Sequence, residues 1–502
     1  MSDVPSPLAT ADAPRPIVLG EGGAPNDSLA SAHARIRDSY RQYAAAFGRR
    51  RFLRGGYLKE IVRRTRFYVE PGARVLEIGV GSGDLLAALE ARRAVGIDLS
   101  PEMLEIARRR WPELTLHEMP AESVGELEGP FDYIVFSDVT VFLHDIARVL
   151  RIVLPLTHPR TRLVFNFHSR VWQPLLWLLA RLGLHHPHPR MNWVTAEDLQ
   201  NLLELAGYEV VKRDTGTLLP VAIPGLAWLA NRVLYRLPVF RLGCLVNWIV
   251  ARPRGRWANE ADLAVTVVVP CRNEAGHIAE IVRRVPAMGR RTELIFVEGH
   301  SRDDTWDRVQ DAVAHPGRTD LAVSAMRQTG KGKGDAVRMG FAQATGDVLM
   351  ILDADLTVPP ESCPEFLRVL ASGDAEFVNG SRLVYPMDDE AMRFLNILGN
   401  KFFARVFSAL LDQPIKDTLC GTKVLARTDY ERLARGRHYF GGLDPFGDFD
   451  LLFGASKLSL RIRELPVRYA ARRYGETNIR RFRDGFLLLR MSLLALRRLK
   501  LV

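Results

Sequence analysis

The sequence predicts an α/β protein with two domains, and two features lead to this expectation. The chain has 502 residues, which is more than one hydrophobic core normally serves. Two series of short apolar runs, alternating with amphipathic segments, begin near Val75 and near Ala264. Such alternation is typical of mostly parallel sheets, which bind ligands at the carboxyl ends of their strands. We therefore expect a first domain over residues 31–255 and a second over residues 256–502.

The composition is that of a folded protein with anionic ligands. Hydrophobic residues make up 47% of the chain and charged residues 25%, and the net charge is +11. This charge favours nucleic acid, a membrane surface or phosphorylated small molecules as partners, without choosing among them. The cysteines are too widely spaced for a disulfide framework or a CxxC metal site, which favours a reducing cytoplasm; they are Cys244, Cys271, Cys363 and Cys420.

Three segments depart from this average composition. Residues 1–30, rich in Pro, Ala, Ser and Gly, are expected to form a disordered tail without a secretory signal. Residues 217–255 are unusually apolar, but arginines and prolines interrupt them. Residues 486–502 combine Leu with Arg and Lys, as helices at membrane surfaces do. Both apolar segments are equally compatible with packing on their own domains, so contact with an anionic membrane surface is one of two interpretations.

The first series contains a glycine-rich loop. An apolar run that begins at Val75 continues into the pattern Glu77-x-Gly79-x-Gly81-x-Gly83 and then into an apolar helical segment. Glycines allow sharp turns and close approach to a ligand, and a helix start offers free N–H groups. A second apolar run ends about twenty residues later in Asp98, a carboxylate suited to ribose hydroxyls. This spacing predicts a site for a nucleoside cofactor.

These motifs resemble those of class I S-adenosylmethionine-dependent methyltransferases. The resemblance runs through VLEIGVGSGD, GIDLSPEMLEIAR and FDYIVFSDVTVFLHD, and reaches about residue 211. It implies a Rossmann-like methyltransferase fold that binds S-adenosyl-L-methionine. It also implies that Asp98 binds the ribose, that Met103 lies against the adenine, and that the methionine part is held by Glu77, Gly79, Gly81 and Gly83. The family's Asp-Ala-Glu segment near the adenine is Pro120-Ala121-Glu122 in this chain.

The residue that would assist methyl transfer is open at this point. Transfer from a sulfonium depends on alignment of the acceptor with the methyl group more than on a base. His144 and His168 are candidate bases for a hydroxyl acceptor, and ordinary pocket or surface histidines are the alternative.

In the second series, residues 346–361 (GDVLMILDADLTVPPE) place two carboxylates where a buried strand ends. Two hard oxygen ligands at this position, Asp353 and Asp355, suit Mg²⁺ or Mn²⁺ held between the protein and a pyrophosphate. The alternative is an ordinary acidic turn. The upstream segment KGKGDA, which includes Lys333, Gly334 and Asp335, could bind phosphates through its lysines and backbone N–H groups. Together the two segments predict a nucleoside diphosphate site.

Residues 263–483 resemble family 2 glycosyltransferases of the GT-A fold, particularly the branch of polyprenyl-phosphate mannosyl and glucosyl transferases. The similar segments are VVVPCRNEAGHI, DADLTVPPE, FVNGSRL, DTLCGTKVL and RYAARRYGETNI. The resemblance implies that Asp353 and Asp355 hold the metal. An acceptor phosphate would meet Arg382 together with Arg472 or Arg473. The nucleotide sugar would be bound by Pro270, Arg272, Asn273, Glu274, Glu298, Lys333, Gly334, Asp335 and Asp353.

Three departures from the family pattern leave the acceptor open. Glu298-Gly299 replaces a pair of aspartates, so the base of the nucleotide is not predicted, and Thr357 replaces a glutamine that lipid-phosphate relatives tend to carry. Asp448 and Asp450 lie where relatives with hydroxyl acceptors keep their base. A hydroxyl acceptor would need Asp448, or else Asp450, as base, whereas a lipid phosphate needs arginines instead. Capping of a following helix is the alternative role for the two aspartates.

The sequence therefore predicts a bifunctional enzyme of glycan or glycolipid biosynthesis. We expect methyl transfer from S-adenosyl-L-methionine and metal-dependent, inverting sugar transfer from a UDP- or GDP-linked donor to a glycan, sugar or lipid phosphate. The expected location is the cytoplasm, peripheral to the inner face of the plasma membrane. The alternatives are a membrane-surface scaffold with one inactive nucleotide site, and a nucleic-acid methyltransferase. No RNA-binding motif supports the latter, so no nucleic-acid partner is expected.

Overall fold

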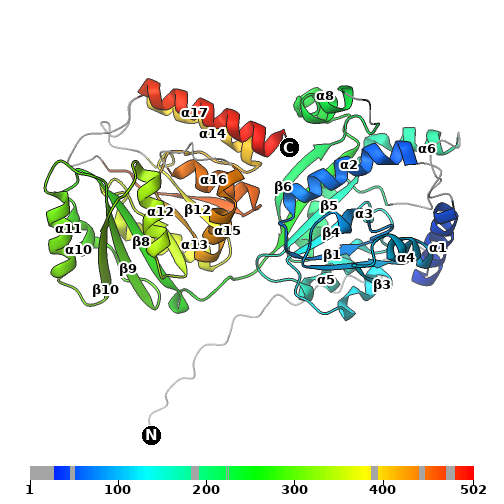
Figure 1. Ribbon diagram of the computed structural model, residues 1–502, viewed down its shortest axis with the longest axis horizontal. Coiled ribbons are helices and arrows are strands. Elements are labelled where there is room, and N and C mark those ends of the chain that lie inside the picture. Colours follow the sequence, from blue (N-terminus) through cyan, green and yellow to red (C-terminus); the bar gives the residue numbers. More distant parts are fainter. Residues whose placement is uncertain are drawn as a thin grey trace, which may run out of the picture.

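The computed structural model describes residues 28–45, 51–181, 192–221, 223, 225–385, 394–439, 447–470 and 481–501. Within these residues the chain forms two α/β units that lie side by side, each built on a seven-stranded sheet (Figure 1). Residues 74–253 supply the strands of the first sheet, and residues 264–466 supply those of the second. The predicted α/β class with two sheets is confirmed.

The first sheet has the strand order β3-β2-β1-β4-β5-β7-β6, and only β7 runs antiparallel to its neighbours. The order reverses at β1, so the loop after β1 lies where doubly wound sheets bind ligands. Strand β7 shows that the apolar segment 217–255 ends inside this sheet and completes its core. The strands are β1 (Arg74–Ile78), β2 (Arg93–Asp98), β3 (Thr115–Glu118), β4 (Tyr133–Ser137), β5 (Arg162–His168), β6 (Tyr208–Gly216) and β7 (Val246–Pro253).

Some helices of the first unit begin at a residue whose side chain caps them. Ser100 accepts a hydrogen bond from the backbone N–H of Met103 at the start of α4, and Thr195 forms a capping box with Asp198 at the start of α7. Helix α1 begins inside the segment expected to be a tail, of which residues 1–27 lie outside the described residues. The helices are α1 (Leu29–Ala45), α2 (Arg51–Tyr68), α3 (Asp84–Ala87), α4 (Pro101–Arg110), α5 (Ile146–Val153), α6 (Gln173–Arg181), α7 (Ala196–Leu205), α8 (Leu226–Arg232) and α9 (Pro238–Arg241).

The second sheet has the order β10-β9-β8-β11-β13-β12-β14, in which β13 alone is antiparallel to its neighbours. Its parallel part brings the carboxyl ends of β8, β9 and β11 to one edge. The strands are β8 (Ala264–Cys271), β9 (Arg291–Glu298), β10 (Leu321–Arg327), β11 (Val348–Ile351), β12 (Phe377–Ser381), β13 (Lys423–Ala426) and β14 (Ile462–Pro466).

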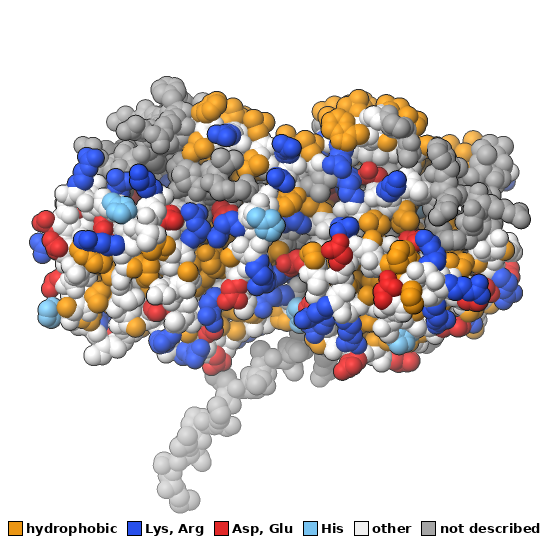
Figure 2. All heavy atoms as spheres, viewed as in Figure 1, with side chains coloured by type: hydrophobic (Ala, Val, Ile, Leu, Met, Phe, Trp, Pro, Cys, Tyr) orange, Lys and Arg blue, Asp and Glu red, His pale blue; other side chains and the backbone are white. Residues whose placement is uncertain are grey.

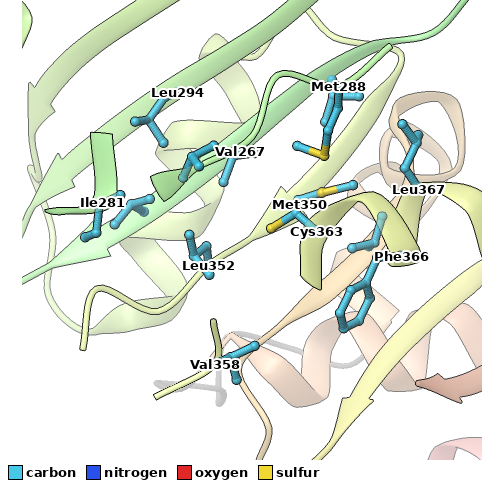
Figure 3. Close-up of a cluster of buried hydrophobic side chains, with 14 of the residues drawn as sticks. Val267, Ile281, Met288, Leu294, Met350, Leu352, Val358, Cys363, Phe366 and Leu367 are labelled. Atoms are coloured by element: carbon cyan, nitrogen blue, oxygen red, sulfur yellow. The ribbon is translucent and has the colours of Figure 1, made fainter. Parts of the chain in front are cut away.

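Helices cover both faces of the second sheet, so its inner strands are apolar throughout (Figure 1). Figure 3 shows one of its cores, in which Val267 and Met350 of the sheet pack between Ile281 and Phe366 of two helices. The helices are α10 (Ile278–Arg284), α11 (Thr305–Ala314), α12 (Lys333–Gln343), α13 (Cys363–Ala371), α14 (Phe394–Leu411), α15 (Arg427–Arg435), α16 (Asp448–Lys457) and α17 (Arg481–Ala495), followed by a π-helical turn, Leu496–Lys500.

Buried polar contacts join the two units. Arg162 of β5 is 1% exposed and donates to both carboxylate oxygens of Glu376 at 2.7 Å and to the carbonyl of Ser459 at 2.9 Å. The ammonium of Lys212 donates to the carbonyl of Ser456 at 2.6 Å. Removal of one partner from a buried charge pair typically lowers the free energy of unfolding by several kcal/mol. These contacts therefore hold the units in one arrangement.

All four cysteines are buried and free, as their spacing predicts. Among the helices that the structure describes, none combines the length and the apolarity needed to cross a bilayer.

Candidate active sites

The glycine loop after β1 is held against the end of β2. Gly79, Gly81 and Gly83 all have positive φ, of 77°, 52° and 74°. A side chain at Gly79 would lie 2.6 Å from Val139, so this position requires glycine. The N–H of Gly81 donates to the Asp98 carboxylate at 2.8 Å. The structure thus brings the predicted loop and the predicted ribose carboxylate together.

Glu77 lies beneath this loop and is 2% exposed. Its Oε2 atom has no hydrogen-bond partner, which is rare for a buried polar atom. Burial, followed by the charge of Asp98, raises the pKa of Glu77 well above its usual range. The structure therefore places Glu77 beneath the glycine loop, and Glu77 does not line the cavity into which this loop opens.

The loop opens into a cavity of about 130 Å³. Asp98 and the whole segment Pro120-Ala121-Glu122 line this cavity, together with Met119. Met103 does not line it, because its side chain is buried behind Gly81. Adenine would therefore meet the 119–122 segment before it meets Met103.

Helix α1 covers the outer side of the cavity, although no motif in the sequence predicts this contact. His33, Ile36 and Tyr40 of this helix line the cavity. His33 lies 3.3 Å from Glu122, and Arg37 donates to the carbonyl of Leu99 at 3.2 Å. These contacts bridge residues that are far apart in the sequence.

Asp138 follows β4 and forms a second polar group at the cavity wall. Tyr57 donates to its carboxylate at 2.8 Å, and Asn166 donates at 3.1 Å. Burial and the charge of Asp138 raise the pKa of Tyr57, so the phenol keeps its proton and remains a donor. Asp138 was not among the site residues predicted from the sequence, although it follows an apolar strand as Asp98 does. His168 stacks on Tyr57 with ring centroids 5.8 Å apart, whereas His144 is exposed.

The second candidate site is at the end of β11. The ammonium of Lys333 lies 2.5 Å from Asp353, and each side chain is about a quarter exposed. Asp355 accepts hydrogen bonds from the backbone N–H and the hydroxyl of Thr357, at 3.2 and 2.7 Å. The structure therefore places the predicted Lys333 in contact with Asp353, and Thr357 orients Asp355.

Two glycines allow the backbone to approach this pair closely. A Cβ atom on Gly421 would lie 1.9 Å from Asp353 and 2.3 Å from Lys333. A Cβ atom on Gly447, which precedes α16, would lie 2.4 Å from the Cα atom of Gly334 in α12. Gly421 was missed as a site residue, although the sequence CGTK places a glycine among residues assigned to the acceptor side.

Residues after β8 and β9 form an interlocked loop. Asn273 has a φ of 56°; its N–H donates to Ser301 at 2.9 Å and its side-chain oxygen accepts from the N–H of Arg302 at 2.8 Å. Glu298 is buried and accepts from the N–H of Ser301 at 2.5 Å. Glu274 is buried beside His277, with 2.9 Å between the carboxylate and Nδ1.

The other residues predicted to bind the nucleotide differ in exposure. Pro270 is the last residue but one of β8 and is half-buried, whereas Arg272, which follows the strand, is exposed. The Asp335 carboxylate accepts hydrogen bonds from Gln328 and from the N–H of Gly330, at 2.9 and 3.0 Å. Asp335 thus secures the turn before α12, beside Gly334.

Arg382, predicted to bind an acceptor phosphate, is fixed by a buried carboxylate. Its guanidinium forms a two-point contact with Asp417, at 2.7 and 2.8 Å, and its backbone N–H donates to the same carboxylate. Asn400 of α14 donates to Asp417 at 3.0 Å. Burial raises the pKa of Asp417, but the hydrogen bonds and charge of Arg382 outweigh burial and lower it to about 2. Arg472 and Arg473 lie outside the described residues.

The two candidate bases lie in the first turn of α16. Asp448 is its first residue and Gly447 its cap; the Asp448 side chain lies outside the described residues. Asp450 accepts a hydrogen bond from the Arg437 guanidinium at 2.7 Å.

Protein side chains alone do not complete a metal site in the described parts of the chain. No group of three or more His, Cys, Asp or Glu residues that could hold a metal ion is found there. Asp353 and Asp355 supply hard oxygen donors, and Mg²⁺ usually takes one or two carboxylates together with substrate phosphates. The pair therefore fits a metal ion that binds with a diphosphate.

Comparison with protein families assigns each unit separately. Residues 47–213 match the model of a methyltransferase domain, and residues 266–433 match that of glycosyl transferase family 2. The chain joins a methyltransferase domain to a family 2 glycosyltransferase domain. The Rossmann-like methyltransferase fold and the GT-A fold expected from the sequence are confirmed, and both domains match families of enzymes.

Individual relatives match the glycosyltransferase domain. The chain is 28% identical to the low-salt glycan biosynthesis hexosyltransferase Agl6 of Haloferax volcanii, over 45% of this chain and 53% of that protein. It is 29% identical to a dolichol-phosphate mannosyltransferase of Pyrococcus furiosus, over 43% and 60%. The chain thus spans little more than half the length of these relatives. Glucosyl-3-phosphoglycerate synthase of Mycobacterium tuberculosis, solved with Mn²⁺ and UDP, is 18% identical with a TM-score of 0.34, over 47% and 80%.

Proposed function

We propose that the protein is a bifunctional enzyme of glycan or glycolipid biosynthesis. The methyltransferase domain would use S-adenosyl-L-methionine, and the glycosyltransferase domain would transfer a sugar, with inversion, from a UDP- or GDP-linked donor. The observation that carries the proposal is the convergence of Lys333, Asp353 and Gly421 at the carboxyl end of β11. The names of the two relatives support a glycan or a polyprenyl phosphate as the sugar acceptor.

In the glycosyltransferase domain, Asp353 and Asp355 would hold Mg²⁺ or Mn²⁺. When bound, the ion would neutralise charge on the diphosphate. Lys333 would bind the diphosphate as well, together with backbone N–H groups at the start of α12. A single displacement at the anomeric carbon, with the diphosphate leaving on the opposite side, inverts its configuration.

A lipid phosphate is the acceptor that the geometry favours over a hydroxyl group. Asp417 holds Arg382 as a fixed, charged donor, which suits an anionic acceptor. Of the two candidate bases, Asp450 is paired with Arg437, which leaves Asp448 as the base for a hydroxyl acceptor. Arg472 or Arg473 would be the second cation at an acceptor phosphate.

In the methyltransferase domain, the glycine loop and Glu77 would hold the methionine part of the cofactor, and Asp98 its ribose. The cofactor supplies an electrophilic methyl group when bound. Asp138, oriented by Tyr57 and Asn166, is the polar group best placed to align an acceptor hydroxyl at the cavity wall. Catalysis would then rest on alignment, which can supply a large part of the rate.

Two measurements on the full-length chain test the proposal. Mn²⁺-dependent hydrolysis of UDP- and GDP-sugars should fall about 100-fold in Asp355→Ala and stay unchanged in Asp311→Ala, an exposed control on α11. If no donor is hydrolysed, or if Asp355→Ala matches the wild type, the glycosyltransferase proposal fails. Calorimetric titration with S-adenosyl-L-methionine should show binding that Asp98→Ala weakens. Absence of binding to the wild type would refute the methyltransferase half and favour the scaffold alternative.

A further inference from the structure

Exposed apolar side chains gather along one edge of the molecule. Figure 2 shows them at the top of both domains, where Figure 1 places α17 with α14 and, beyond them, α8. Helix α17 and the turn after it have two apolar sides. One side buries Leu488, Met491 and Ala495 in the core. The other exposes residues spaced by three or four positions, which therefore share one helix face: Phe486 (71%), Leu489 (46%), Leu493 (59%) and Leu496 (38%).

The methyltransferase domain supplies the second half of this edge. Trp177 of α6 is 57% exposed and Trp228 of α8 is 60% exposed. Large exposed tryptophans are unusual on a soluble surface and are enriched where proteins meet the interface of a bilayer. Apolar neighbours with similar exposure are Val171, Leu175, Leu178, Leu226, Leu229, Leu237, Val239, Phe240 and Leu242.

The two halves are continuous where the chain ends. Arg232 donates to the carbonyl of Leu501 at 2.7 Å, and Arg236 donates to the carbonyl of Lys500. The hydroxyl of Tyr235, between these arginines, reaches the carbonyl of Lys500 at 3.5 Å. The segment that follows α8 thus holds the last turn of the glycosyltransferase domain. The exposed residues of both domains, hereafter the apolar edge, form one surface.

The charges on the apolar edge have one sign. Residues 217–245 contain no Asp or Glu, and neither do α6, α14 or residues 485–501. The same segments expose Lys401, Arg405, Arg490 and Arg497. A surface that combines tryptophan, leucine and arginine without acidic residues matches the interface of a membrane with anionic lipids, to which basic residues contribute attraction.

Both candidate sites connect to this edge. Helix α14 exposes Phe402 on the edge, and its buried Asn400 holds Asp417, the partner of Arg382. In the methyltransferase domain, His168 stacks on Tyr57, and the next residue bonds to the carbonyl of Leu245, beside the apolar segment. Contacts between side chains and backbone thus link each of the two sites to the same surface.

We propose that the apolar edge binds an anionic lipid surface through both domains at once. The methyltransferase domain is then a membrane-binding element in its own right, through α6 and α8. The inference deepens the proposed function, on which it rests for the two activities, because it assigns both acceptors to one class: lipid-linked molecules at the surface of a single bilayer.

Sedimentation of the full-length protein with vesicles tests this contact. Phosphatidylcholine vesicles that contain phosphatidylglycerol should bind the protein, and vesicles without phosphatidylglycerol should bind it more weakly. Trp228→Glu and Phe486→Glu should each lower the partition coefficient about tenfold or more, because each removes a large apolar side chain from the interface. The control is Leu205→Glu. Leu205 is as exposed as Trp228 but lies at the end of α7, a helix that packs beside α5. It should change binding by less than about twofold.

Two results would overturn the proposal. If Phe486→Glu abolishes binding while Trp228→Glu binds as the wild type does, the methyltransferase domain makes no contact. If the wild type ignores vesicles and forms a dimer that Trp228→Glu dissociates, the edge joins two copies of the chain instead. Hydrolysis of a water-soluble donor, measured in the same variants, should stay unchanged. Its absence in the wild type would refute the proposed function without affecting the vesicle result.

Discussion

Replacement of Gly421 by alanine should separate the chemistry of the glycosyltransferase site from its stability. The new methyl group would lie 1.9 Å from the Asp353 carboxylate and 2.3 Å from the Lys333 ammonium. To reach a tolerable 3.0 Å, the carboxylate must move by about 1.1 Å (3.0 − 1.9) and the ammonium by about 0.7 Å (3.0 − 2.3). Misplacement of about 1 Å can cost about 100-fold in rate, or about 2.7 kcal/mol.

The stability of the variant should change little. The atoms that must move are the ends of two partly exposed side chains, so the free energy of unfolding should fall by less than about 1 kcal/mol. Gly436→Ala is the matched control, because its φ is −85° and its Cβ atom would meet no neighbour closer than 3.7 Å. The assay is Mn²⁺-dependent donor hydrolysis, with thermal unfolding in parallel. Wild-type hydrolysis in Gly421→Ala would refute a reaction centre at this pair.

Three further predictions concern buried charges and pH. Asp417→Asn should destabilise the fold at neutral pH, because Arg382 lowers the pKa of Asp417 to about 2. The ionised carboxylate stabilises the fold fully above its unfolded pKa of about 3.9, and this stabilisation disappears as the pH falls towards 2. The free energy of unfolding, measured across this acid range, should therefore depend less on pH in the variant than in the wild type. Glu77 has a raised pKa, so its contribution to stability falls as pH rises above about 4.3; Glu77→Gln should remove this slope in thermal unfolding measured from acid to neutral pH. Burial lowers the pKa of Lys212 to about 7, so stability should rise with pH from about 7 to about 10.4, and Lys212→Met should abolish this rise in denaturant titrations.

The parts of the sites that sequence could predict are those built from one contiguous segment. The glycine loop at Gly79–Gly83 and the strand end at Asp353 and Asp355 contain their chemistry within a few residues, and backbone geometry fixes their place at a sheet edge. The turn at Thr357 belongs to the same segment and orients Asp355 directly. Such features need no knowledge of distant contacts.

The parts that could not be predicted depend on contacts between distant segments. Asp138 gains its role from Tyr57, which is 81 positions away, and Arg382 is fixed by Asp417, 35 positions away. Strand β7 enters the first sheet between β5 and β6, yet the exposed segment before it is also rich in apolar residues. Hydrophobicity alone does not distinguish burial in a sheet from exposure at an edge.

The orientation of the two sites is set by charges that neither domain satisfies alone. Arg162 of the methyltransferase domain is buried against Glu376 of the glycosyltransferase domain. Glu209 of the methyltransferase domain forms ion pairs with Arg461 and Arg463 of the glycosyltransferase domain, at 2.8 and 3.0 Å. Separation of the domains would break the buried pair between Arg162 and Glu376, which costs several kcal/mol, whereas Glu209 would keep Arg252 of its own domain as a partner. Fusion in this chain therefore fixes how the sites face one another, and a flexible linker would give only proximity.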